Sequence, residues 1–158
     1  MKKALFVLLL TAVATTTVAQ ESKNVYNFLR LPASAHASAL GGENISLVED
    51  DEALIFHNPA LLSTVSDKTI NLNYMNYMAG ANMLSAAFNR VIKERASAAV
   101  SALYIDYGKM KQTTVENQQL GDFSAKDIAL SGYFSYLLTD QLAGGITAKF
   151  ITSYIGGY

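Results

Sequence analysis

The sequence has 158 residues, with 12 Lys and Arg, 13 Asp and Glu, and a formal net charge of −1. Binding to phosphate backbones needs grouped Lys and Arg, so this balance argues against nucleic acid as a partner. The absence of cysteine excludes disulfide frameworks and thiolate zinc sites together.

Residues 1–19 have the layout of a secretory signal peptide. Lys2 and Lys3 precede an apolar run over 4–14, and small residues then lead to Ala19 and Gln20. We therefore expect export and cleavage between Ala19 and Gln20. The alternative is a membrane anchor. It needs about 20 apolar residues, and the run over 4–14 is too short for that. No later stretch is long and apolar enough for a membrane helix, so membrane residence would depend on strands.

Residues 20–66 form an irregular segment with signals for short helical turns. Pro32 opens a run of small residues that Gly41 and Gly42 stop, which predicts one compact turn. A second turn is predicted where Asn58 is the N-cap and Pro59 takes the first helical position. Such turns suit a plug in the mouth of a barrel. An ordinary periplasmic extension is the alternative.

From residue 67 onward the sequence predicts about five strands. No proline follows Pro59, and 12 of the 16 Phe and Tyr residues lie at or beyond Tyr74. Apolar residues alternate with small or polar ones with a period of two, and Leu103, Ile105 and Tyr107 share one face. The predicted strands cover 70–75, 84–89, 96–107, 127–138 and 141–150.

The connections predict an antiparallel up-and-down meander. Short turns are expected at 79–82, 92–95 and 139–140, and a long polar excursion is expected over 108–123. If the first strand rises from the periplasm, the turns at 92–95 and 139–140 are periplasmic and the long loop is external. Outer-membrane barrels have this arrangement, although the short external turn at 79–82 departs from it.

The strand pattern allows a membrane barrel or a soluble one. Alternation also fits a sandwich or a lipocalin-like barrel, whose apolar face points inward. Strands of about ten residues suit a tilted membrane crossing, which takes about 9–11 residues. Strand length and the export signal favour an all-β fold, an antiparallel up-and-down transmembrane barrel in the outer membrane, with lipid against the apolar face.

The strand count raises the question of closure. Single-chain outer-membrane barrels start at about eight strands, and two bare sheet edges are not tolerated in lipid. Either strands were missed, or residues 67–158 are the first strands of a larger barrel and the chain is an N-terminal fragment. We favour the fragment. Tyr158 as the aromatic end of a complete barrel is the weaker alternative.

The sequence contains no pattern typical of a catalytic, metal or cofactor site. His36 and His57 lack a matching ligand spacing and are interpreted as solvated or hydrogen-bonded structural residues. The acids over 49–52 lack the spacing and central glycine of an EF-hand, so a solvated loop is expected rather than calcium. No serine lies in a Gly-x-Ser-x-Gly elbow. We expect no enzyme activity.

Several short stretches, taken together, resemble the PorV/PorQ family of outer-membrane proteins, and its PorQ branch in particular. These stretches are residues 26–35, 39–42, 58–62, 72–77, 104–109 and 123–127. Their order and spacing extend the resemblance over nearly all of the mature chain.

The resemblance implies a component of the type IX secretion system of Bacteroidetes, with a barrel similar to FadL-type channels. Members have about fourteen strands and roughly twice this length, in line with a fragment. A PorQ-like member is expected to hold a PorZ-like partner at the cell surface, where cargo is processed and attached to lipopolysaccharide. No catalytic residues carry over. A FadL-like channel for hydrophobic molecules and a soluble exported β-barrel that binds a ligand remain alternatives.

Overall fold

The computed structural model describes residues 25–42, 45–114 and 118–156, with only the backbone of Gln119. The predicted signal peptide over 1–19, the cleavage site at Ala19 and Gln20, and Tyr158 lie outside the described residues.

One antiparallel sheet contains five strands in the order β1-β2-β3-β4-β5. The strands are β1 (Ile70–Asn76), β2 (Asn82–Lys93), β3 (Ala96–Thr113), β4 (Gln119–Thr139) and β5 (Leu142–Gly156). The all-β class and the meander topology are therefore confirmed. Within the described part of the chain the sheet is not closed, because β1 and β5 each pair on one side only.

The short connections agree with the prediction, whereas the long one does not. β2 ends at Lys93 and β3 begins at Ala96, and a two-residue turn likewise separates β4 from β5. The 3₁₀ turn η4 (Met78–Gly80) joins β1 to β2. The predicted polar excursion over 108–123 is wrong for most of its length, because β3 continues to Thr113 and β4 begins at Gln119.

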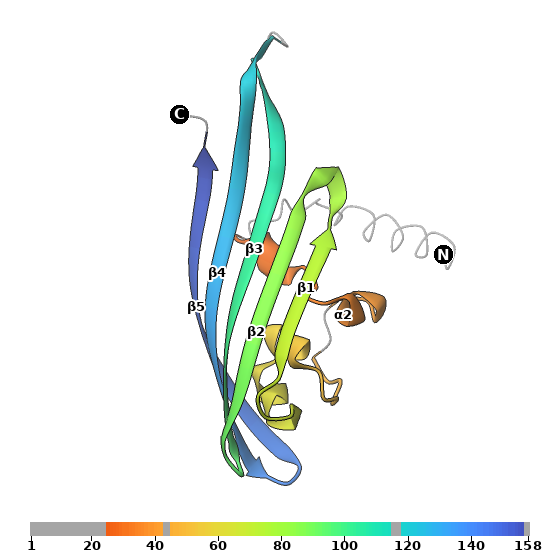
Figure 1. Ribbon diagram of the computed structural model, residues 1–158, viewed down its shortest axis with the longest axis vertical. Coiled ribbons are helices and arrows are strands. Elements are labelled where there is room, and N and C mark those ends of the chain that lie inside the picture. Colours follow the sequence, from red (N-terminus) through yellow and green to blue (C-terminus); the bar gives the residue numbers. More distant parts are fainter. Residues whose placement is uncertain (1–24, 43–44, 115–117, 157–158) are drawn as a thin grey trace, which may run out of the picture.

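The strands can continue through this polar stretch because backbone pairing does not require apolar side chains. Met110 pairs with Phe123 and Lys111 pairs with Asp122, so the ladder persists. Gly108 has a φ of 73° at a register shift between Asp106 and Lys109, a bulge that glycine accommodates without strain. The β3–β4 hairpin consequently projects well beyond the β1–β2 hairpin (Figure 1).

Four short helical turns from the N-terminal segment, here residues 25–66, lie on one side of the sheet (Figure 1). They are η1 (Asn27–Arg30), α2 (Ala35–Ala39), η2 (Glu52–Phe56) and η3 (Pro59–Thr64). The sheet therefore has a covered face, which packs against this segment, and an exposed face on its other side.

Burial alternates along the central strands and separates these two faces. The covered face carries mainly small or polar buried residues: Ser85, Ala87, Asn89, Ser97, Ala99, Ser101, Ala129, Ser131, Tyr133 and Ser135. The exposed face carries large apolar residues: Leu72, Leu84, Phe88, Val100, Leu130, Phe134, Ile146 and Phe150. Small side chains on the covered face let the helical turns approach the sheet closely.

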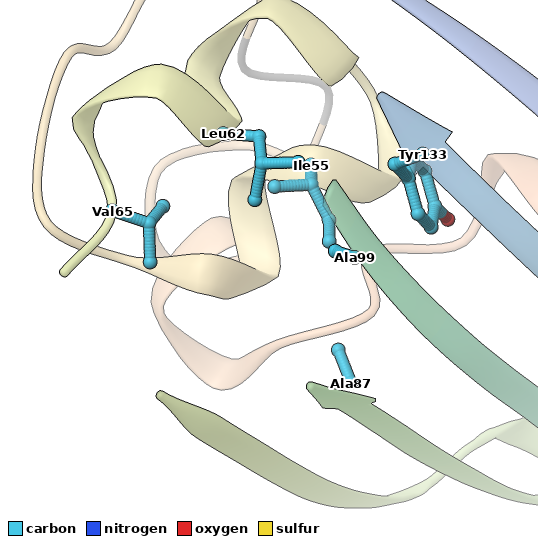
Figure 2. Packing of buried hydrophobic residues seen from close by; sticks show 6 residues of the cluster. All are labelled: Ile55, Leu62, Val65, Ala87, Ala99 and Tyr133. Atoms are coloured by element: carbon cyan, nitrogen blue, oxygen red, sulfur yellow. The ribbon is translucent and has the colours of Figure 1, made fainter. Parts of the chain in front are cut away.

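Two apolar clusters hold the N-terminal segment on the sheet. In the first, Ile55 and Leu62 from η2 and η3 point toward Ala87, Ala99 and Tyr133 (Figure 2). In the second, Phe28 of η1 packs against three larger apolar residues of the covered face, Met83, Leu103 and Ile105, and against Ala129. The part of the covered face that contacts η1 is therefore apolar.

Candidate functional site between the N-terminal segment and the sheet

The two predicted helical turns form, with adjusted boundaries. The Asn58 side chain accepts a hydrogen bond from the Ala60 N–H at 3.0 Å, and Pro59 occupies the first position of η3, a 3₁₀ turn. Pro32 lies before α2 rather than in it. The helix begins at Ala35 because Ser34 is the N-cap, whose Oγ accepts from the Ala37 N–H at 3.0 Å.

Gly41 and Gly42 end α2, as their sequence position predicts. Both adopt positive φ angles, 96° and 100°, which favour glycine. The Gly42 N–H donates to the Ala37 carbonyl oxygen at 2.8 Å, which satisfies one of the last helical carbonyl groups.

Polar contacts fasten the segment to three strands of the sheet. The Ser85 hydroxyl of β2 donates to the Ala33 carbonyl oxygen at 2.8 Å, and both residues are buried. The Ser135 hydroxyl of β4 donates to the Ala60 carbonyl oxygen at 3.2 Å. The Nζ of Lys149 on β5 lies 3.5 Å from the Phe56 carbonyl oxygen. Each contact satisfies a carbonyl group of an otherwise irregular segment.

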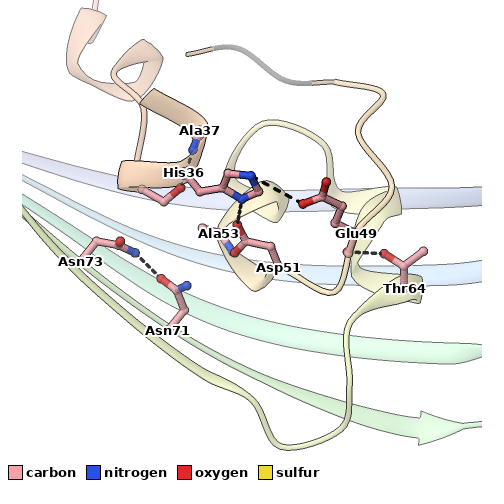
Figure 3. Close-up of polar contacts among 9 residues, drawn as sticks. His36, Ala37, Glu49, Asp51, Ala53, Thr64, Asn71 and Asn73 are labelled. Carbon is pink, nitrogen blue, oxygen red and sulfur yellow. Dashed lines mark hydrogen bonds and ion pairs between the residues drawn. The ribbon is translucent and has the colours of Figure 1, made fainter. Parts of the chain in front are cut away.

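His36 links α2 to the loop that precedes η2. Its Nδ1 donates to Asp51 at 2.9 Å and its Nε2 lies 3.6 Å from Glu49 (Figure 3). The hydrogen bond to Asp51 and the negative charges of Asp51 and Glu49 raise the pKa of His36. His36 is therefore a hydrogen-bonded histidine that joins two parts of the segment, in line with the structural role expected for it.

The prediction of a solvated loop over 49–52 is wrong for Glu52, whereas Glu49 and Asp50 are exposed and lie outside any helix or strand. Asp51 is the N-cap of η2 and accepts from the Ala53 N–H at 2.9 Å, which turns the chain into the 3₁₀ helix. Glu52, at the first position of this helix, is therefore only 1 % exposed. Neither of its carboxylate oxygens has a hydrogen-bond partner within the described residues. Burial, followed by the charge of Asp51, raises its pKa to about 7.

A cavity of about 490 Å³ lies between the start of α2 and strands β1 and β2. Its lining includes Pro32, Ala35 and Ala39 from the segment, and Met75 and Met83 from the strands. A space of this size and largely apolar lining is within the range of small-molecule sites.

The exposed face changes character near one end of the sheet. Tyr74 and Tyr104 stand at the same register level, each opposite Leu84. One level further, Asp106 pairs with Lys126, and their side chains approach to 3.6 Å. The apolar band therefore ends at a row of tyrosines beside charged residues.

Within the described ranges, no group of three or more His, Asp or Glu residues comes together in a way that could hold a metal ion. Among the same residues, no helix is both long and apolar enough to cross a membrane. No protein-family model, no curated protein and no solved structure matches this chain.

Three features of the site were missed at the sequence level. The first is η2, although Asp51 before an apolar run repeats the pattern of Asn58 before Ala60-Leu61-Leu62 and could have revealed it. The second is η1, for which we find no comparable signal. The third is the set of contacts that Ser135 and Lys149 make with the segment, together with the close approach of Gly145 to the Pro59 backbone. These contacts join residues far apart in the chain and leave no local pattern.

Proposed function

We propose that this chain contributes to an outer-membrane β-barrel of the type IX secretion system, which anchors a surface partner for cargo processing and attachment. One observation carries the membrane part of the proposal. The sheet buries its small and polar face under its own N-terminal segment and leaves its large apolar side chains uncovered. Leu72 and Phe150, for example, are 74 % and 68 % exposed. Exposed apolar area on this scale needs an apolar partner.

The covered face favours a barrel interior over the core of a soluble sandwich. A soluble fold would turn its apolar residues inward and leave the small and polar ones in water. Here the N-terminal segment occupies the position of a plug, with η3 against β3, β4 and β5 and η2 against β1 and β2. The band that ends at Tyr74 and Tyr104 also resembles the aromatic girdles of membrane barrels.

The secretion role rests on the resemblance to the PorV/PorQ family and on the projecting β3–β4 hairpin. With the two short β2–β3 and β4–β5 turns on the periplasmic side, this hairpin faces the cell exterior. Its outer part, over 108–123, is the region that we propose for contact with a PorZ-like surface protein.

Fractionation and a deletion strain test this proposal. The full-length protein should resist carbonate extraction and sediment with the outer membrane. Its deletion should abolish surface-attached cargo while leaving the uptake of hydrophobic molecules unchanged. Recovery of the protein in the soluble periplasmic fraction would reject the barrel.

The second candidate is a FadL-like channel, which the cavity between α2 and strands β1 and β2 favours. Accumulation of a radiolabelled long-chain fatty acid separates the two functions. Uptake that depends on this protein, with surface-attached cargo unaffected by its deletion, would support the channel and reject the scaffold.

A further inference from the structure

The exposed face is not evenly filled, because small residues follow one another across the sheet. Ala86 of β2 pairs with Ala102 of β3, and Leu72 and Leu130 flank this pair in the same register row. Large residues surround the two alanines, so a hollow remains above them. We call this hollow the furrow.

The furrow consists of two adjoining depressions that share Leu72, Ala86 and Ala102. Their volumes are about 410 and 400 Å³. Tyr104 and Ile128 line the first, and Phe88 and Val100 line the second. Both linings are largely apolar, which suits an alkyl chain rather than a polar ligand.

Basic residues stand directly beyond one end of the furrow. Lys126 follows Ile128 at the next position on the same face of β4. Lys109 pairs with Ser124 and Lys111 with Asp122, so these two lysines occupy the next two rows of that face. We call Lys109, Lys111 and Lys126 the lysine cluster.

Acidic residues only partly neutralise the lysine cluster. Asp122 stands opposite Lys111, and Asp106 lies 3.6 Å from the Lys126 Nζ. Asp106 also accepts a hydrogen bond from the Gly108 N–H at 2.9 Å. The three lysines outnumber the two aspartates. In addition, one carboxylate oxygen of Asp106 accepts the backbone hydrogen bond from Gly108, and the other lies near Lys126.

We propose that the furrow and the lysine cluster together bind an acylated lipid of the outer leaflet whose phosphate headgroup has a net negative charge. An alkyl chain fills the furrow, and the anionic headgroup contacts the cluster. This inference rests on the proposed membrane location, because it needs the exposed face to meet lipid with the β3–β4 hairpin outside. Charge complementarity selects the occupant, since a headgroup with a net negative charge gains more from the cluster than a zwitterionic headgroup, whose phosphate is offset by its own cation.

Native mass spectrometry of the full-length protein, purified in mild detergent, tests the site. The protein is offered equal amounts of diphosphoryl lipid A and phosphatidylethanolamine. We expect preferential retention of lipid A by the unsubstituted protein, and no folding defect can obscure that measurement. Equal retention of the two lipids would overturn the proposal.

Variants separate the two parts of the site. Lys126→Gln should raise the Kd for lipid A about five-fold, the expected effect of one basic residue near an anionic surface. Ala102→Leu, which fills the furrow and keeps the lysines, should lower retention of lipid A as well. The matched controls are Arg90→Gln, a basic residue beyond the other end of the furrow, and Ala148→Leu on β5, outside the furrow lining.

The outcomes distinguish this inference from the proposed function. Protein that sediments with the outer membrane but shows equal loss of lipid A in Lys126→Gln and Arg90→Gln would overturn the lipid site alone. Protein recovered from the soluble fraction would overturn the lipid site and the barrel together.

Discussion

Gly145 of β5 and Pro59 at the start of η3 are in backbone contact. A Cβ atom added at Gly145 would lie 2.5 Å from both the Pro59 carbonyl carbon and the Ala60 nitrogen. Real Cβ atoms do not approach backbone atoms this closely, so only glycine permits this contact between the N-terminal segment and the sheet.

We therefore predict that Gly145→Ala displaces η3 from the sheet. Overpacking of this kind costs about 1–3 kcal/mol of unfolding free energy. Gly144→Ala is the matched control, since a Cβ atom there would meet only the Leu138 side chain at an ordinary 3.7 Å. Chemical denaturation, together with hydrogen exchange over 59–65, measures the difference. Equal losses of unfolding free energy in the two variants would argue against close backbone contact between η3 and Gly145.

The attachment of the N-terminal segment should weaken as pH rises. Glu52 has a pKa of about 7 in the folded protein, against an ordinary value of 4.5, because of its burial and the charge of Asp51. The folded state therefore retains a proton that the unfolded state loses between these two values, and stability falls with rising pH across that window. The raised pKa of His36 acts in the same direction, through stability lost as pH rises through that pKa.

Glu52→Gln tests this pH dependence. The variant should retain at pH 8 most of the stability that it has at pH 5, whereas the unsubstituted protein should lose stability between them. Unfolding free energies at the two pH values measure this loss of stability. The same measurement on His36→Gln gives the part of the loss that is due to the exposed histidine. An unchanged pH slope in Glu52→Gln would assign the dependence to other groups.

The strands were predictable from the sequence because alternation is a local property. In β4, Ile128, Leu130 and Phe134 are separated by even numbers of positions. Because side chains alternate between the two faces of a strand, these three residues must lie on the same face. The full length of β3 and β4 was not predictable in this way. Polar residues such as Gln112 and Thr113 look like a loop, yet cross-strand backbone pairing keeps them in the ladder.

The candidate site was predictable only in its local parts. Asn58 and Pro59 mark a helix start within a few residues, and the structure has η3 at that place. The partners of the segment on the sheet were not predictable, since Ser135 reaches Ala60 across 75 positions of the chain. Such a contact depends on how the strands stack, which no short window of sequence contains.

The N-cap of α2 should contribute measurably to the attachment of the segment. The Ser34 hydroxyl accepts from the Ala37 N–H, and Ser34 is buried. Ser34→Ala should cost about 1 kcal/mol, the usual loss for a helix N-cap. Ser38→Ala inside the same helix is the control and should be neutral or slightly stabilising. The denaturation midpoints of the two variants measure their stabilities. Similar losses of stability in both would show that the N-cap hydrogen bond is not the cause.

The most direct test of the membrane proposal is a charge on the exposed face. Leu130, on the exposed face of β4, is 52 % exposed. If this face meets the bilayer, Leu130→Arg should reduce the folding free energy in lipid vesicles by about 2–4 kcal/mol. Ser124→Arg, three same-face positions along β4 and beyond Lys126, should cost at most about 1 kcal/mol, the value near the interface.

A soluble fold makes the opposite prediction for this pair of variants. An arginine at an exposed position in water changes stability by no more than about 0.5 kcal/mol, and it would improve solubility by interrupting an apolar patch. The ratio of the two losses is therefore decisive, because both variants add the same side chain to the same face of one strand. A large loss confined to Leu130→Arg requires an apolar medium around that residue, and equal small losses would require water.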